Sequence, residues 1–298
     1  MRFEPVIKWS GSKRSQSEYI VEKIKDLVGL NGATYYEPFC GGASILMQLL
    51  LNKDKVKFKR YICSDYNNDL ISLWNLIKEN PIKVINSYTK MWNELNVDDD
   101  KSRKKQYYYS VRYRFNKEKD PCDFMFIMRT TTNGMPRYNK NGVFNNSFHV
   151  TRNGIIPSTF EKIVLKWSKI LNENNVEFIH RSFDELVINS DMDVIYLDPP
   201  YANTKGMYYG AIDLENIWAF LRDLPCSYIM SFDGKISNGD DLTHAVPEDI
   251  YDSHEYVFSG NSSFRRVIGN SNDSVVSESL YIKDNTSYPT MEFVGDCK

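Results

Sequence analysis

The sequence has few of the residues that cross-link a chain or hold metal ions. Its five cysteines are an odd number, they lie far apart, and no C-x-x-C pair occurs among them. The four histidines are equally scattered. A disulfide framework and an obvious zinc site are therefore excluded, and we expect the protein to bind no metal.

Long apolar segments are also missing. Residues 46–51 form an apolar segment, but it is far shorter than the roughly 18 residues that cross a membrane. The N-terminus carries no apolar signal segment. With 298 residues, 42% of them hydrophobic and 26% charged, the chain is long enough for one large domain or two modest ones. We therefore expect a cytoplasmic protein with no membrane association.

The charge is small overall but unevenly distributed. The formal net charge is -2, whereas residues 101–152 hold twelve Lys or Arg against three Asp or Glu. A basic segment on an acidic body is typical of proteins that bind a polyanion. A mostly helical region, 81–115, ends here in mixed basic and aromatic side chains. These side chains suit nucleic-acid contact, or equally the solvated face of a half-buried helix.

Two strand–turn–helix units in the first 80 residues indicate a nucleotide-binding α/β fold. The first strand, 34–36, ends in Glu37 and leads through Gly41 and Gly42, which allow close backbone approach, into an apolar helix. A carboxylate here would repel a pyrophosphate, so the pattern favours a nucleoside with a cationic or zwitterionic tail. The second strand, 61–64, ends in Asp65, which is placed to accept both ribose hydroxyls or to cap the following helix.

The four residues Asp198-Pro199-Pro200-Tyr201 directly follow a short apolar run, 193–197, that we interpret as a buried parallel strand. Open α/β sheets bind their ligands at the carboxyl ends of such strands. The prolines fix φ and carry no N–H, so the segment offers a carboxylate and carbonyls as acceptors beside an aromatic ring. This arrangement suits the exocyclic amine of a flat base. A plain turn that caps the strand is the alternative.

Other segments carry weaker signals. The turn at 8–14, with cations before a helix, suits a carboxylate or phosphate, or is a plain helix cap. Asp184 is placed to receive an adenine amino group or to cap the next helix. The remaining elements that the pattern predicts are helices and strands at 15–28, 45–51, 70–79, 124–128, 159–171, 176–179, 214–221, 228–231, 251–258 and 275–282.

A β-hairpin is predicted around Asn141-Gly142, which lies between two β-prone runs. A hairpin that carries Arg and Asn can enter a major groove, where Arg pairs with guanine and Asn with adenine. Residues 81–156 therefore read as an insertion in an α/β body made of residues 1–80 and 157–298.

Taken in chain order, the turn at 9–13, the loop at 37–42, Asp65, the basic insertion and the 198–201 segment resemble the Dam family of DNA adenine-N6 methyltransferases over essentially the whole chain. The insertion resembles that family's target-recognition hairpin. The resemblance implies a Rossmann-like class I methyltransferase fold with a mostly parallel sheet, an inserted helical and β-hairpin target-recognition domain, S-adenosylmethionine as methyl donor and double-stranded DNA as substrate.

The resemblance also implies a role for individual residues. Trp9 and Lys13 would hold the methionine end of S-adenosylmethionine, Asp65 its ribose, and Phe183 with Asp184 its adenine. The other residues implied in cofactor binding are Glu37, Pro38, Phe39, Gly41, Gly42 and Asp198. Asp198 and the Pro199 carbonyl would accept the two N6 hydrogens of a flipped adenine, beside Pro200, and Tyr201 would stack on the base. The residues implied in DNA contact are Arg129, Asn133, Gly134, Met135, Arg137, Tyr138, Asn139, Asn145 and Ser147.

The hairpin departs from the family pattern in places. Ser147 stands where many relatives have proline, Met135 replaces a common leucine, and Thr131-Thr132 replace bulkier residues. The recognition sequence therefore stays open, as does the choice between monomer and weak dimer. The alternatives are methylation of cytosine N4 or of RNA, a catalytically silent DNA-binding module, and a protein whose basic segment only binds a partner.

Overall fold

The computed structural model describes residues 3–200, 213–236, 244–261 and 275–285. Its α-helices are α1 (Ser17–Val28), α2 (Ser44–Leu51), α3 (Asn68–Glu79), α4 (Pro81–Leu95), α5 (Lys101–Glu118), α6 (Pro121–Thr130), α7 (Pro157–Asn172) and α8 (Leu214–Arg222). Its strands are β1 (Asn31–Glu37), β2 (Lys57–Asp65), β3 (Val176–His180), β4 (Val194–Leu197), β5 (Ser227–Ile236), β6 (Ser253–Asn261) and β7 (Val275–Lys283). Each predicted helix and strand is present at its place in the chain.

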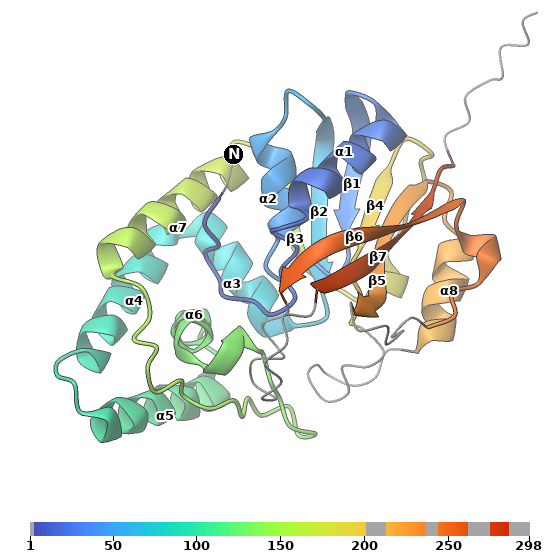
Figure 1. The fold of residues 1–298 in the computed structure, drawn as a ribbon. Helices are drawn as coiled ribbons and strands as arrows, with labels where there is room; N and C mark the ends of the chain where they lie inside the picture. Colours follow the sequence, from blue (N-terminus) through green and yellow to red (C-terminus); the bar gives the residue numbers. More distant parts are fainter. Residues whose placement is uncertain (1–2, 201–212, 237–243, 262–274, 286–298) are drawn as a thin grey trace, which may run out of the picture.

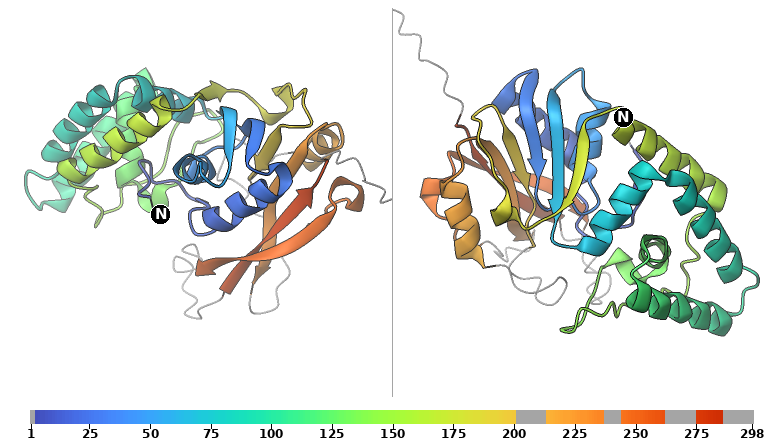
Figure 2. Two further views of the ribbon diagram at one scale, coloured as in Figure 1. Left: turned by 90° about the horizontal axis from the view of Figure 1, so that it is seen from above. Right: turned by 180° about the vertical axis from the view of Figure 1, so that it is seen from behind.

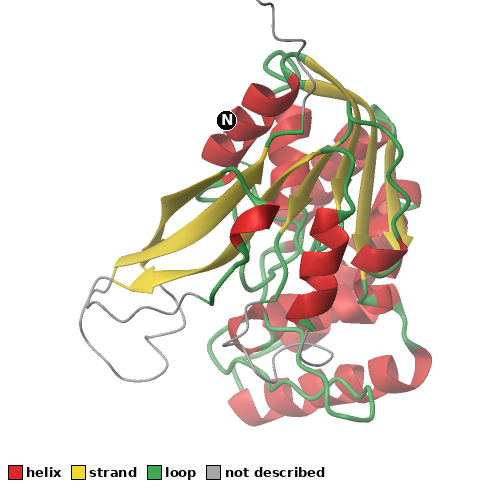
Figure 3. Cartoon of the chain, turned by 90° about the vertical axis from the view of Figure 1, so that its right-hand side faces the viewer, coloured by secondary structure: helices red, strands yellow, loops and turns green. Residues whose placement is uncertain are grey.

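The seven strands form one sheet in the order β3-β2-β1-β4-β5-β7-β6. The first five are parallel, and β7 pairs antiparallel with both β5 and β6. This confirms the predicted α/β fold with a mostly parallel sheet. The strand order reverses between β1 and β4, which is where sheets of this kind bind their ligands. The arrowheads of the parallel strands point toward the side on which α5 and α6 lie (Figures 1 and 3).

Both faces of the parallel part of the sheet are buried, which explains why its strands read as apolar runs. In β1, Tyr35 belongs to the larger core under α1, α2 and α3, and Tyr36 to the smaller core under α8. In β4, Tyr196 and Leu197 divide in the same way. The side chains alternate because successive strand residues point to opposite faces.

The insertion packs on the body without a break in the core. Buried side chains of α4, α5 and α6 join those of α3 and α7 in one hydrophobic cluster. One junction is the stack of Tyr88 in α4 on Phe160 in α7, with ring centroids 3.9 Å apart. The helices α3 to α7 lie together at one end of the sheet (Figure 2). The predicted domain limits at residues 81 and 156 stay a prediction.

Within the described part of the chain, no helix combines the length and the apolar character needed to cross a membrane.

Candidate active site and DNA interface

Three carboxylates stand at the carboxyl ends of three neighbouring strands. Glu37 is the last residue of β1, Asp65 is the last residue of β2, and Asp198 directly follows β4. Since β1 lies between β2 and β4, the three side chains share one edge of the sheet, at the point where the strand order reverses. The sequence predicted that each carboxylate ends a strand, and the sheet order makes them neighbours.

Asp198 is paired with a cation. The Lys13 Nζ lies 2.8 Å from Asp198 Oδ1, and its second acidic neighbour is Glu278 of β7, with Oε2 at 3.4 Å. Burial raises the pKa of Asp198 to about 6, Lys13 opposes this rise, and the charge of Glu278 adds to it. The carboxylate is therefore mostly ionised at neutral pH but close to the range in which it protonates. Pro199 is buried after it, Pro200 is half-buried, and Tyr201 lies outside the described residues.

Glu37 is buried and has donors of its own. The Tyr35 hydroxyl and the Leu46 N–H donate to Glu37 Oε2 at 2.8 and 3.0 Å. Leu46 lies in the first turn of α2, whose N-cap Ala43 supplies no side-chain hydrogen bond, so Glu37 satisfies a helix N–H that would otherwise lack a partner. Burial raises the pKa of Glu37 to about 8, which keeps the carboxyl mostly protonated at neutral pH.

The glycine loop after β1 is held from two sides. Gly41 has φ +45, and a Cβ on it would lie 2.7 Å from Trp9 Nε1, so the indole of Trp9 covers the loop where a side chain would otherwise stand. The Gly41 N–H donates to Asp65 Oδ2 at 3.1 Å, and its carbonyl accepts from Trp74 Nε1 at 2.9 Å. The conformation of the loop thus depends on its contacts with both Trp9 and Asp65.

Asp65 does not cap the following helix. The N-cap of α3 is Asn67, whose side chain accepts from the Leu70 N–H. Asp65 accepts instead from the Gly41 and Asn67 N–H groups, and burial raises its pKa to about 6. The capping alternative is thereby wrong, and the ribose role stays a prediction.

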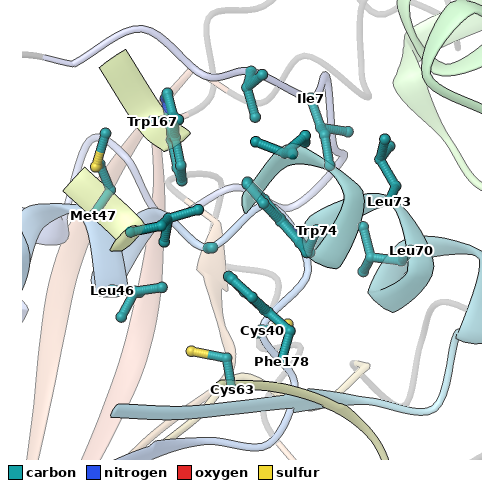
Figure 4. Packing of buried hydrophobic residues seen from close by; sticks show 14 of the residues in the cluster. Ile7, Cys40, Leu46, Met47, Cys63, Leu70, Leu73, Trp74, Trp167 and Phe178 are labelled. Carbon is teal, nitrogen blue, oxygen red and sulfur yellow. The ribbon is translucent and has the colours of Figure 1, made fainter. Parts of the chain in front are cut away.

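Trp74 supports the loop from the core. Its ring lies 5.0 Å from that of Trp167 and 5.2 Å from that of Phe178, stacked on the latter (Figure 4). Trp74 is fully buried, so the hydrogen bond from its Nε1 to Gly41 is anchored in close-packed side chains. The position of the loop is therefore set by the core.

Two aromatic rings adjoin this edge of the sheet. Phe39, half-buried in the loop, and Phe183, buried after β3, have centroids 5.5 Å apart at an angle of 31°. Asp184 next to Phe183 is exposed. It caps no helix, because it lies within the short 3-10 turn Phe183–Glu185, where the Ser182 N–H donates to Glu185. Its predicted role toward adenine remains untested.

The predicted hairpin is present, with side chains that alternate between core and solvent. Antiparallel bridges join Thr131 to Phe148 and Tyr138 to Phe144. The buried hairpin side chains are those of Tyr138, Phe144, Asn146 and Phe148. The exposed ones include Arg137, Asn139, Asn145 and Ser147. Four predicted DNA-contacting residues therefore share the solvent side, whereas Tyr138 faces inward.

An inward-facing residue fixes the hairpin to the body, and an exposed residue closes its turn. The Tyr138 hydroxyl donates to Asp69 in α3 at 2.8 Å. Asn139 Oδ1 accepts from the N–H groups of Asn141 and Val143 and so closes the turn. The hairpin is thereby joined to the helix that begins just after Asp65.

The start of the hairpin touches the N-terminal turn. The Ser10 N–H donates to the Gly134 carbonyl at 3.2 Å. Gly134 has φ +64, and a Cβ on it would lie 2.8 Å from the Lys8 carbonyl oxygen, so only glycine fits this contact. Asn133 beside it has φ +58 and is half-buried, as is Met135. Gly134 thus joins the predicted recognition segment to the predicted cofactor turn.

Arg129 is buried, and its guanidinium is taken up by main-chain acceptors. Its Nε and Nη2 donate to the Val6 carbonyl at 2.9 and 2.6 Å, and Nη2 also contacts the Pro5 carbonyl. Burial lowers the pKa of Arg129 to about 10. In this arrangement Arg129 holds the N-terminal segment against α6, and direct DNA contact would require these hydrogen bonds to break.

Sequence reasoning missed two residues here. Glu278 lies in a strand that was predicted, but no local pattern separates it from other strand carboxylates. Asp69 is buried and accepts from both Tyr138 and Lys119, although its sequence context marks only a helix start. Both interactions join residues far apart in the chain.

Comparison with known proteins identifies the family of the chain. Residues 9–255, well over half of the chain, match the family model for D12 class N6 adenine-specific DNA methyltransferases. The Type II methyltransferase M.MjaIII of Methanocaldococcus jannaschii is 35% identical over 214 residues, 67% of this chain and 70% of that one. The DNA adenine methylase of Escherichia coli K12 is 32% identical over 201 residues, 66% of this chain and 64% of that one.

Among solved structures, the rRNA methyltransferase aviRa of Streptomyces viridochromogenes has a TM-score of 0.38 and 10% identity over 96% of this chain and 86% of that one. The family model and the curated relatives concur with the resemblance predicted from the sequence. The chain belongs to the D12 class of N6 adenine-specific DNA methyltransferases.

Proposed function

We propose that this protein transfers the methyl group of S-adenosylmethionine to the N6 amino group of an adenine flipped out of double-stranded DNA. The observation that carries the proposal is the half-buried Asp198 directly after β4, followed by two prolines and adjacent to the β1 and β2 carboxylates. The same proposal places the protein with DNA in the cytoplasm.

The chemistry requires acceptors at a fixed place. Adenine N6 is a weak nucleophile because its lone pair is delocalised into the ring. The Asp198 carboxylate and the Pro199 carbonyl accept its two hydrogens, favour a tetrahedral amine and so free the lone pair for in-line attack. Asp198 need not be a strong base, since the proton leaves after methyl transfer. A base stacked in a duplex cannot reach this edge, so the proposal requires base flipping.

The residues at the sheet edge fit S-adenosylmethionine. The bound donor supplies an electrophilic sulfonium methyl group. Asp65 accepts from the ribose hydroxyls, and Phe39 and Phe183 offer aromatic surface to the adenine. Glu37, together with Trp9 over the glycine loop, suits the methionine end. Each of these side chains lies on or next to the loop and strand ends described above.

The outward face of the hairpin suits the DNA. Arg137 and Asn145 are exposed there, and Asn133 lies where the hairpin meets the N-terminal turn. Arginine pairs with guanine edges and asparagine with adenine edges in a major groove. Ser147 and Met135 lie on this segment, so we expect the target sequence to depend on them.

The test is methyl transfer from labelled S-adenosylmethionine to unmodified duplex DNA, followed by single-molecule sequencing of the product. N6-methyladenine in one short sequence context is the expected result. Methylation of cytosine, or of RNA alone, would replace the proposed substrate by one of its alternatives. Cofactor binding without any transfer would refute the proposed reaction.

A further inference from the structure

Lys13 lies between two carboxylates that come from distant parts of the chain. Its Nζ is 2.8 Å from Asp198 Oδ1 after β4 and 3.4 Å from Glu278 Oε2 in β7. The Lys13 side chain is 6% exposed, and those of Asp198 and Glu278 are 20% and 17% exposed. Glu278 is not among the predicted site residues, and the proposed reaction assigns it no role.

The two carboxylates hold the ammonium unequally. Asp198 is within hydrogen-bonding distance, whereas Glu278 Oε2 is buried and accepts no hydrogen bond from the described residues. Lys13 also donates to the Gly11 carbonyl at 3.4 Å. Glu278 therefore presents an unused acceptor to a cation that now lies on the catalytic carboxylate.

The backbone holds Glu278 at this place. It is paired with Gly234 of β5, just after a bulge in that strand at which Asp233 has φ +42. A Cβ on Gly234 would lie 2.0 Å from the Ser277 carbonyl oxygen and 2.9 Å from the Cα of Glu278. Glycine thus permits the close approach of β5 and β7 at Glu278, next to the bulge.

We propose that Glu278 is a positioning residue that takes over the Lys13 ammonium when the amino group of the target base hydrogen-bonds to Asp198. The proposal rests on the function proposed above, because it requires a substrate N–H at Asp198. A buried ammonium held by no carboxylate would be strongly unfavourable. Glu278 avoids this: hydrogen bonds between ammonium and carboxylate are about 2.7–2.9 Å long, so a shift of a fraction of an ångström completes the transfer.

The test is Glu278→Gln, which keeps the shape and removes the charge. We expect the variant to bind S-adenosylmethionine and duplex DNA normally. Its kcat should fall on the order of tenfold with little change in KM, because Lys13 then stays on Asp198. The acid limb of its pH–rate profile should also move to lower pH, since the negative charge that raises the pKa of Asp198 is gone. A purely structural role would not move that limb.

Glu255→Gln is the matched control. Glu255 lies in the neighbouring strand β6 and pairs with Lys23 at 2.6 Å. This variant loses an ion pair between β6 and α1 without touching Asp198, so its kcat and pH profile should equal those of the unmodified protein.

A double-mutant cycle tests whether Glu278 acts through Lys13. In a Lys13→Met background, Glu278→Gln should cause no further loss of kcat. The comparison of Lys13→Met with the double variant remains possible if Glu278→Gln alone fails to fold, because neither of these two proteins contains the Lys13 ammonium. An unchanged kcat and pH profile in Glu278→Gln, or an equal loss in both backgrounds, would overturn the proposal. If the unmodified protein methylates no adenine, the proposed function itself fails, independently of the variants.

Discussion

The protonation of Glu37 gives a prediction that the structure lets us quantify. Burial raises the pKa of this carboxyl from its ordinary value of 4.5 to about 8, against the hydrogen bonds from Tyr35 and Leu46, and the charge of Asp198 adds to the rise. Between pH 4.5 and about pH 8 the unfolded chain has released the Glu37 proton, whereas the folded protein keeps it. The protein therefore loses stability as the pH rises through this range.

The substitution Glu37→Gln removes this loss. One pKa unit corresponds to about 1.4 kcal/mol, so the 2.5 units between pH 4.5 and pH 7 amount to roughly 3 kcal/mol. The Gln carbonyl can still accept from Tyr35 and Leu46, and its amide group replaces a hydroxyl donor of the protonated acid. We expect the variant to match the unmodified protein near pH 4.5 and to exceed its free energy of unfolding by about 3 kcal/mol at pH 7.

Urea unfolding of both proteins from pH 4.5 to pH 8 measures the difference. All other titrating groups are common to the two proteins, so the difference isolates Glu37. Two parallel curves, or a variant that is less stable at pH 7, would refute the reasoning. If Glu37 also receives the cationic end of S-adenosylmethionine, binding near pH 7 should release a proton from the unmodified protein and none from the variant, as calorimetry in buffers of different ionisation enthalpy can show.

Four further predictions concern the site and the hairpin. Asp198→Ala should abolish methyl transfer and leave S-adenosylmethionine binding largely intact, as single-turnover and titration experiments can show. The acid limb of kcat should have its midpoint near pH 6, where Asp198 protonates, and Lys13→Met should raise that midpoint because the cation lowers the pKa; a limb that stays in place would contradict this assignment. Arg129→Ala should destabilise the fold by about 3 kcal/mol, because it leaves buried carbonyls unpaired, and thermal unfolding measures this loss. Arg137→Ala should leave the fold unchanged but weaken discrimination at one base pair by about 1–3 kcal/mol in competition binding; equal weakening on all sequences would indicate a phosphate contact instead.

Much of the fold was readable from local patterns. The strand–turn–helix units around Glu37 and Asp65 are short in sequence, and glycine, asparagine and apolar spacing mark their boundaries. The hairpin was also predicted from a local pattern. Asn141-Gly142 predicted its turn, and the alternation of exposed and buried side chains around Arg137 and Asn145 follows from the two-residue period of a strand.

Long-range contacts were not readable in this way. Arg129 was predicted to contact DNA, but its guanidinium binds carbonyls more than 120 residues earlier in the chain. The donors to Glu37 include a helix N–H nine residues later, which no strand pattern indicates. Such pairings depend on how elements pack. The Arg129–Val6 pair exceeds any sequence window of ten or twenty residues, and the Glu37–Leu46 pair, although closer, depends on how α2 lies against the end of β1.

The sequence by itself determined the order of the helices and strands. It also determined that Glu37, Asp65 and Asp198 each stand at a strand end. Both follow from local signals, because secondary-structure propensity, the spacing of apolar residues and turn residues act between near neighbours. Only the tertiary structure decided which strand ends meet. The placement of β1 between β2 and β4 brings the three carboxylates to one edge, and the insertion of β7 between β5 and β6 brings Glu278 to Lys13. The neighbours of β1 are fixed by burial of both faces of the parallel strands, a property of the assembled sheet that no single segment carries.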